Sequence, residues 1–84
     1  MSYSVSIKQS ALKSLKNIAR EDRPRIIEAI DQLKVNPAAG GVLKGEYSGL
    51  RRIRIGSYRV VYEVHDEKLT VLVIRIGHRR EVYR

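Results

Sequence analysis

Residues 50–64 read LRRIRIGSYRVVYEV, and this stretch decides the fold. Apolar and charged residues alternate on both sides of Gly56-Ser57, a two-residue connection that favours a tight primed turn between antiparallel strands. Such a turn fixes the pairing of the two strands. The expected pairs are Ile55 with Tyr58, Arg54 with Arg59, Ile53 with Val60, Arg52 with Val61 and Arg51 with Tyr62.

This register gives the hairpin two different faces. Directly opposed residues share a face and successive residues alternate, so Arg52, Arg54 and Arg59 are expected to point away from the core. The apolar partners, Tyr58 and Tyr62 among them, are expected to pack inside. Opposed like charges at Arg54 and Arg59 cost a sheet about 0.2–1 kcal/mol, which indicates that the face holds an anion.

The composition bounds the class of protein. The chain has 84 residues, of which 43% are hydrophobic, and we expect one small domain spanning residues 1–84. The absence of cysteine excludes disulfides and thiolate zinc sites and fits a reducing compartment. No apolar run approaches the length of a membrane span, and the first four residues lack signal-peptide character. We therefore expect a cytoplasmic protein with no membrane partner.

The charge is strongly basic. Seventeen Lys and Arg residues stand against nine Asp and Glu, which gives a formal net charge of +8. A small domain with this balance indicates a polyanionic partner such as RNA, DNA or an acidic protein. Charge alone does not choose among these, and it is also compatible with a basic surface that only maintains solubility.

Residues 3–36 predict a strand and two helices. Residues 3–7 alternate with period two, as in a short strand with one buried face. A helix capped by Ser10 follows, and a second helix is capped by Asp22 with Pro24 in its first turn. Asn36-Pro37 ends it. The expected apolar stripes are Leu12, Leu15, Ile18 and Ala19 on the first helix and Ile26, Ile27, Ile30 and Leu33 on the second.

Residues 37–49 predict an irregular loop, with glycines at 40, 41, 45 and 49. Val42, Leu43 and Tyr47 are expected to anchor it to the body of the protein. Loops of this length in compact domains are often functional, and Lys44 within it is a candidate RNA contact.

The last third of the chain predicts an interior strand and a closing segment. Asp66-Glu67 is expected to turn the chain into residues 69–76, a nearly continuous apolar run typical of a strand covered on both faces. If His65 pairs with Lys68, Val61 faces Leu72 and Arg59 faces Ile74, which sets an apolar floor beside the arginines. Gly77 is expected to break the strand, so that Arg79 and Tyr83 reach the arginines.

The resulting architecture is α+β, with the order β-α-α-β-β-β and an antiparallel helix pair on one face of a small, mainly antiparallel sheet. The sequence resembles those of the RelE-type toxins of type II toxin–antitoxin systems, within the RelE/ParE superfamily. The likeness covers nearly the whole chain. It is carried by Ala11-Leu12-Lys13, Leu43-Lys44-Gly45, residues 58–64 with Asp66-Glu67-Lys68, and residues 73–79 through Glu81-Val82-Tyr83.

The resemblance implies a ribosome-dependent mRNA endoribonuclease that arrests translation. Such an enzyme enters the ribosomal A site and cuts mRNA by attack of a ribose 2′-oxygen on the adjacent phosphorus, with neither metal nor cofactor. Its implied partners are the ribosome, mRNA and a cognate RelB-like antitoxin.

The resemblance also implies roles for individual residues. Arg59 and Arg79 match the family's phosphate-binding arginines, and Tyr83 matches its C-terminal tyrosine for proton transfer or base stacking. Arg52 and Arg54 fall where relatives often place lysines, and because arginine hardly titrates we interpret both as clamps, not proton donors. The expected catalytic set is Arg54, Arg59, Arg79 and Tyr83, and the expected RNA contacts are Arg51, Arg52, Lys44 and His78.

Two questions stay open at the level of sequence. The general acid or base is either Tyr83 or His78, the latter being the side chain near the site whose unperturbed pKa is close to neutral. The activity also has two alternatives, a ParE-like inhibitor of DNA gyrase without nuclease activity and a catalytically degenerate toxin that only binds RNA.

Overall fold

The computed structural model of the protein describes residues 2–43 and 49–78. The element order confirms the predicted alternation of one strand, two helices and a set of strands. Along the chain, the strands and helices are β1 (Ser4–Ile7), α1 (Gln9–Lys16), α2 (Arg23–Gln32), β2 (Gly41–Val42), β3 (Arg51–Ile55), β4 (Tyr58–His65) and β5 (Thr70–His78). Two short 3-10 turns, η1 (Pro37–Ala39) and η3 (Asp66–Lys68), lie before β2 and before β5.

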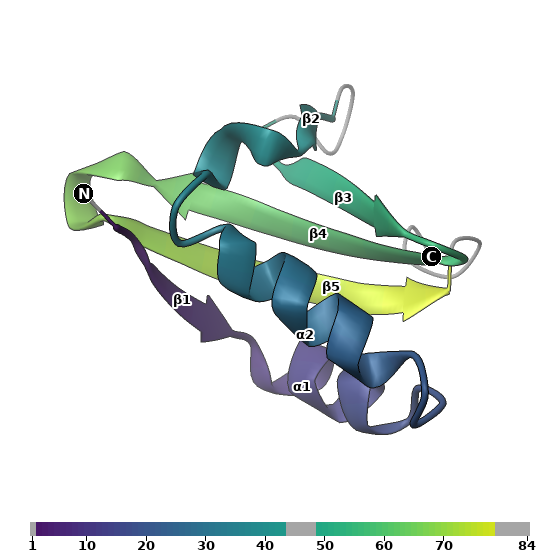
Figure 1. Cartoon of the computed structure of the whole chain (residues 1–84). Helices are drawn as coiled ribbons and strands as arrows, with labels where there is room; N and C mark the ends of the chain where they lie inside the picture. Colours follow the sequence, from purple (N-terminus) through teal and green to yellow (C-terminus); the bar gives the residue numbers. More distant parts are fainter. Residues whose placement is uncertain (1, 44–48, 79–84) are drawn as a thin grey trace.

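The strands form one five-stranded sheet in the order β1-β5-β4-β3-β2. β1 is parallel to β5 and the other neighbours are antiparallel, so the predicted mainly antiparallel sheet is confirmed. Both helices lie on the same face of this sheet (Figure 1). β5 has a partner on each side, which agrees with its nearly continuous apolar sequence.

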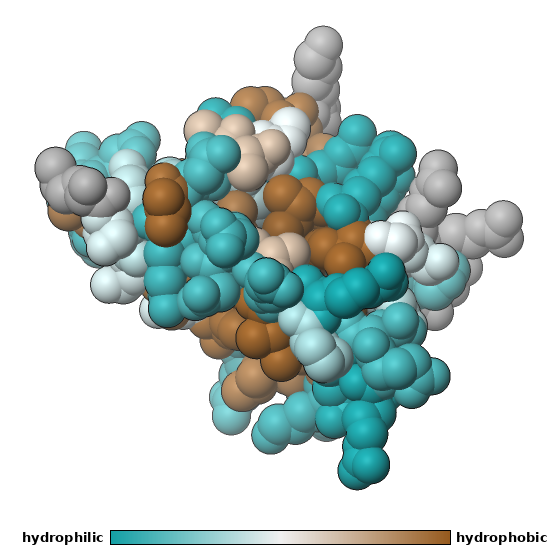
Figure 2. Space-filling view, viewed as in Figure 1, coloured by the Kyte–Doolittle hydropathy of each residue, from teal (hydrophilic) through white to brown (hydrophobic). Residues whose placement is uncertain are grey.

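The hydrophobic core fills the space between the helices and the sheet. It consists of Ala11, Leu15, Ile18, Ile26, Ile30 and Leu33 from the helical half and Val60, Tyr62, Val71, Val73 and Ile76 from the sheet. Figure 2, viewed from the helix side, shows mostly hydrophilic residues with apolar ones exposed between them. Among residues 2–43 and 49–78, no helix is long and apolar enough to cross a bilayer.

The phase of α1 differs from the prediction. The helix starts directly after Lys8, so Ser10 lies inside it, and the Ser10 carbonyl accepts a hydrogen bond from the Ser14 hydroxyl at 3.1 Å. Leu12 is 38% exposed, whereas Ala11 is buried together with Leu15 and Ile18. The sequence contains apolar residues on two neighbouring stripes, and packing against β5 selects the stripe that holds the smaller Ala11.

The prediction for α2 is correct at its start and wrong at its end, because the helix ends at Gln32 and not at Asn36-Pro37. Asp22 stands at the N-cap, but its side chain makes no capping hydrogen bond. Ile26, Ile30 and Leu33 are buried, whereas Ile27 is 52% exposed. The buried positions follow the spacing i, i+4, i+7, and Ile27 lies at the border of that stripe.

The loop before β3 contains a strand that the sequence did not reveal. Gly41 pairs with Arg52 and Val42 pairs with Arg51, so β2 is a two-residue strand at the edge of the sheet, next to β3. Val42 is 59% exposed and does not anchor the loop as predicted. Leu43 is half-buried and its amide donates to the Leu50 carbonyl at 2.8 Å. The third expected anchor, Tyr47, lies outside the described residues.

The β3–β4 register matches the prediction at all five pairs, from Ile55 with Tyr58 to Arg51 with Tyr62. The β4–β5 register was predicted wrongly. His65 pairs with Thr70 because the connection is the 3-10 turn η3 followed by Leu69 with φ +49°, and not a two-residue turn. A bulge between Val61 and Tyr62 shifts the pairing once more.

This register has two consequences at the end of β5. Val61 pairs with Arg75 and Arg59 pairs with Gly77, so Leu72 and Ile74 do not lie opposite Val61 and Arg59 as expected. Gly77 also does not break the strand, because β5 continues to His78.

Candidate nucleic-acid interface

Four arginines lie on the face of the sheet opposite the helices, which we call the arginine face. Arg52 and Arg54 come from β3, Arg59 from β4 and Arg75 from β5. Alternation along each strand sends these side chains away from the core, because their direct neighbours Ile53, Val60 and Ile76 face the helices. Three of the four arginines were placed on this face from the sequence.

The arginines form two rows across the strands. Row one contains Arg54 opposite Arg59, followed by Gly77, which adds no side chain. Row two contains Arg52 and Arg75 on the two sides of Val61. Adjacent strands lie about 4.8 Å apart, and rows two residues apart are separated by about 6.7 Å along the strands.

Each row combines one exposed and one half-buried arginine. Arg54 is exposed, whereas Arg52 and Arg59 are half-buried, and the ε-nitrogen of Arg59 is shielded from solvent. Val61 is 2% exposed although it lies outside the core cluster on the helix side. The half-buried Arg52 and Arg59 therefore lie partly out of bulk water, where electrostatic attraction to an anion is stronger.

Arg75 is the residue that sequence reasoning missed. It is exposed and forms the β5 end of row two. In the register expected from a two-residue turn, Arg59 faced Ile74, and the next residue, Arg75, fell on the core side. Arg75 is the single charged residue in the apolar run 69–76. Because a charged side chain is rarely tolerated at a core-facing position, its presence could have indicated that the expected register was wrong.

Arg51 lies on the opposite face, as its pairing with Tyr62 requires. Its Nη1 donates to the Gly40 carbonyl at 2.8 Å. The Tyr62 hydroxyl accepts from the Gly40 amide at 2.9 Å and donates to the Pro37 carbonyl at 2.7 Å. Both side chains hold the start of the loop, so Arg51 does not join the arginine face, and its expected contact with RNA stays a prediction.

Gly40 is the close approach that makes this arrangement fit. A Cβ at this position would lie 2.3 Å from the Arg52 carbonyl oxygen and 2.7 Å from the Tyr62 hydroxyl. Only glycine therefore allows the loop to pack against the backbone of β3, the strand that carries Arg52 and Arg54.

His78 also lies on the helix side. It pairs with Tyr58, and the two rings meet edge to face at a centroid distance of 5.9 Å and an angle of 76°. The structure thus separates the His78 side chain from the four arginines, and its expected contact with RNA stays a prediction.

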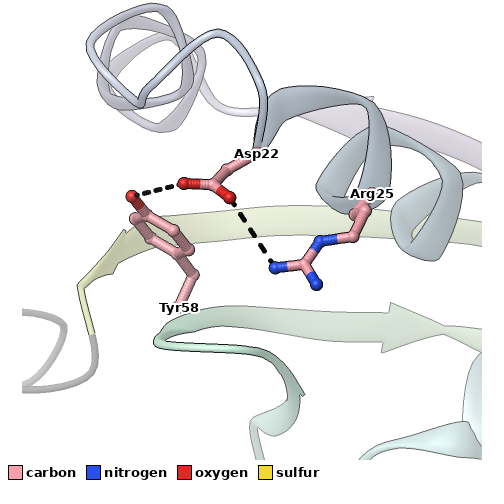
Figure 3. A network of polar contacts seen from close by, with 3 residues as sticks. All are labelled: Asp22, Arg25 and Tyr58. Carbon is pink, nitrogen blue, oxygen red and sulfur yellow. Dashed lines mark hydrogen bonds and ion pairs between the residues drawn. The ribbon is translucent and has the colours of Figure 1, made fainter.

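Besides its ring contact with His78, Tyr58 bonds Asp22 at the start of α2 (Figure 3). Its hydroxyl donates to Asp22 at 3.3 Å, and the same carboxylate lies 3.7 Å from Nη2 of Arg25. Burial, together with the Asp22 carboxylate, raises the pKa of Tyr58 above 10.0. The neutral phenol is therefore favoured, and Tyr58 is a donor that positions α2 against the hairpin.

Three predicted site residues, Lys44, Arg79 and Tyr83, lie outside the described residues, so their roles stay predictions. Residues 2–43 and 49–78 contain no group of three or more His, Cys, Asp or Glu side chains arranged to hold a metal ion. What the described part offers is fixed positive charge. Guanidinium groups present planar pairs of donors that match phosphate oxygens.

Comparison with known proteins extends over almost the whole chain. A sequence model of the family described as ParE toxin of the type II toxin-antitoxin system parDE matches residues 5–83. Toxin RelG of Mycobacterium tuberculosis is 30% identical, and the alignment covers 100% of this chain and 99% of that relative.

Solved structures agree with this result. A double arginine-to-alanine mutant of Escherichia coli toxin RelE in the free state has a TM-score of 0.82 at 30% identity, covering 99% of this chain and 92% of that one. The toxin chain of the archaeal RelE-RelB complex from Pyrococcus horikoshii has a TM-score of 0.79 at 29% identity, covering 96% of this chain and 99% of that one.

Proposed function

Because this chain belongs to the ParE toxin family of type II toxin–antitoxin systems, within the RelE/ParE superfamily, we propose that its arginine face performs endonucleolytic cleavage of mRNA on the ribosome. The observation that carries the proposal is row one, where Arg54 and Arg59 are opposed on the face turned away from the helices. The two guanidinium groups come from neighbouring strands and can donate to the oxygens of one phosphate from two sides.

The proposed reaction is a transesterification. The ribose 2′-hydroxyl gives up its proton as its oxygen attacks the neighbouring phosphorus. The bond from phosphorus to the 5′-oxygen breaks and that oxygen takes up a proton, so the products are a 2′,3′-cyclic phosphate and a 5′-hydroxyl. The pentavalent phosphorane carries more negative charge than the resting diester. Arg54 and Arg59 stabilise that extra charge without gaining or losing a proton, because arginine stays protonated near neutral pH.

The remaining roles belong to the C-terminal segment. We assign a second phosphate contact to Arg79 and proton transfer to Tyr83, since the ring of His78 is engaged with Tyr58 on the helix side. Lys44 and Arg52 add sequence-independent contacts to the RNA backbone, whose strength falls as salt rises.

We further propose that the partner in the resting cell is an antitoxin of RelB type. Solved complexes of similar toxins contain RelB, and the net charge of +8 of this chain suits an acidic segment that folds on binding. A bound segment over the arginine face would block access of mRNA.

The decisive experiment is single-turnover cleavage of mRNA in the presence and absence of programmed ribosomes, with mapping of the 5′ ends. We expect cleavage with ribosomes only, and a decrease of about 10²-fold or more for Arg59→Ala and for Arg79→Ala, because each removes transition-state stabilisation. Arg20→Ala is the matched control, since Arg20 is an exposed arginine in the turn between the helices. Wild-type rates in both test variants would refute the assignment.

A second function is favoured by the family model itself, which describes ParE toxins. A ParE-like protein would inhibit DNA gyrase by binding it and would need no phosphate-transfer cluster. Intact mRNA in the cleavage assay, together with loss of supercoiling in a separate assay with DNA gyrase, would select this alternative. Binding of RNA without cleavage or gyrase inhibition would indicate the catalytically degenerate toxin.

A further inference from the structure

We infer that row two, formed by Arg52, Val61 and Arg75, binds the phosphate next to the scissile one, so that two consecutive phosphates of an extended RNA strand lie along β3 and β4. This inference rests on the proposed function, in which row one holds the scissile phosphate. It assigns a role to Arg75, which neither the sequence pattern nor the resemblance identified.

The spacing of the rows supports this arrangement. Arg52 and Arg54 are separated by one residue on β3, and Arg59 and Val61 by one residue on β4. Both intervals correspond to about 6.7 Å along the strands, a distance close to one nucleotide step of an extended single strand. A strand of RNA aligned with β3 and β4 therefore meets one row per phosphate.

The width of row two suits a single phosphate group. Arg52 and Arg75 lie on the strands on either side of β4, so their backbones are about 9.6 Å apart. Arginine side chains are long enough to converge from that distance above Val61. A phosphate held between them would accept donors from two sides, as row one provides from Arg54 and Arg59.

Val61 places a buried apolar side chain between the two arginines of row two. It is 2% exposed, although its face of the sheet carries no helix. Long cationic side chains cover apolar surface with their methylene stems while the charged ends stay at the surface. Arg52 and Arg75 flank Val61 in the register, so stems lying over it would orient their guanidinium groups before RNA arrives and lower the entropy cost of binding.

The positive surface ends one row further along. There Glu63 lies opposite Leu72, and the Glu63 carboxylate contacts Nε2 of His65 at 2.8 Å. A carboxylate at this place repels a third phosphate or at best leaves it without a cation. The described part of the arginine face therefore accommodates two phosphates, and the RNA backbone is expected to leave the sheet beyond row two.

The test combines a protein variant with a chemical change in the RNA. Synthetic mRNAs carry one uncharged methylphosphonate at the phosphate immediately before, immediately after, or two steps away from the cleaved bond, and cleavage is measured on programmed ribosomes. We expect Arg75→Ala to slow cleavage of unmodified mRNA by about 10-fold, the loss of one charge-assisted contact. Arg75→Lys should recover part of the rate, and Arg20→Ala should leave it unchanged.

The coupling between the two changes identifies the contact. With wild-type protein, one of the two adjacent methylphosphonates should slow cleavage by about 10-fold or more. With Arg75→Ala, the same methylphosphonate should cost several-fold less than with wild-type protein, because only the contact with Arg52 is left to lose. The methylphosphonate two steps away should have no effect with either protein.

The possible failures are distinguishable. If wild-type protein cleaves and Arg59→Ala is slow, but the effects of Arg75→Ala and the methylphosphonate multiply independently, the inference is wrong and the proposed function stands. The same holds if Arg75→Ala cleaves at the wild-type rate. If wild-type protein cleaves no mRNA on ribosomes, the proposed function fails and the inference fails with it. Circular dichroism and thermal melting of Arg75→Ala establish that the variant is folded.

Discussion

Tyr62 connects the core of this protein to the loop that precedes β3. Its side chain is fully buried, while its hydroxyl bonds both the Gly40 amide and the Pro37 carbonyl. Together with Arg51, which donates to the Gly40 carbonyl, it fixes residues 37–40 against the strand that carries Arg52 and Arg54. Tyr62 thus contributes both to the packing of the core and to the position of residues 37–40 next to β3.

Replacing Tyr62 by Phe removes two hydrogen bonds and keeps the ring. We expect Tyr62→Phe to lower the free energy of unfolding by about 1–3 kcal/mol, because the buried Gly40 amide loses its acceptor. Urea denaturation followed by circular dichroism measures this change. Tyr3→Phe is the control, since its hydroxyl bonds Asp66 at an exposed site and should contribute less than about 1 kcal/mol. Equal losses in the two variants would contradict the role given to Tyr62.

At the scale of single elements, α2 shows how packing selects one of two possible stripes. Ile26 and Ile27 are neighbours with the same side chain, yet Ile26 is 0% and Ile27 is 52% exposed. The Asp22 carboxylate at the start of α2 accepts the Tyr58 hydroxyl (Figure 3), which ties the rotation of the helix to the hairpin. Sequence periodicity alone left both residues on the apolar stripe.

The pair provides a matched test of the helix orientation. We expect Ile26→Ala to lower the free energy of unfolding by about 2–5 kcal/mol, the combined cost of lost burial and a cavity. Ile27→Ala should change it by less than about 1 kcal/mol, because half of the side chain already contacts water and alanine favours the helix. Chemical denaturation of both variants measures the two changes in the free energy of unfolding. A larger loss for Ile27→Ala than for Ile26→Ala would mean that α2 is rotated from the orientation described.

β5 shows the same dependence on non-local contacts. The bulge between Val61 and Tyr62 changes which residues of β5 oppose β4, and it brings Arg75 to the arginine face instead of the core. A shift of one residue moves a side chain from one face to the other. The composition of the arginine face is therefore set partly by an irregularity that belongs to the pair of strands and not to either strand alone.

At the scale of the whole molecule, three tyrosines join distant parts of the chain. Tyr3 in the N-terminal segment bonds Asp66, Tyr58 bonds Asp22, and Tyr62 bonds the loop at residues 37–40. The hydrogen bond to Asp66 raises the pKa of Tyr3, and burial is the main cause that raises the pKa of Tyr58 and Tyr62. In each case the folded state favours the protonated phenol.

This predicts a loss of stability at alkaline pH. A folded-state pKa above the unfolded value gives stabilisation that is complete below pH 10.0 and is lost as the pH rises through the folded-state pKa. We expect the melting temperature to fall progressively above about pH 10, measured by circular dichroism from pH 8 to pH 12. Tyr58→Phe should show a shallower fall over this interval than the wild type. A variant with the same slope as the wild type would exclude Tyr58 from the effect.

The sequence by itself determined the order of the helices and of every strand except β2, and the β3–β4 hairpin with Arg52, Arg54 and Arg59 on one face. These features are local: a two-residue turn at Gly56-Ser57 sets the register, and alternation along each strand sets the direction of every side chain.

Only the tertiary structure decided the β4–β5 register, the two-residue strand β2, the buried stripe of each helix and the side on which Arg51 and His78 lie. These depend on contacts between segments far apart in the chain, where several alignments satisfy the same apolar pattern and packing chooses among them. Arg75 reached the arginine face, and His78 reached Tyr58, because the η3 turn and the bulge together set the alignment, and the bulge belongs to the contact between β4 and β5 and not to either strand alone.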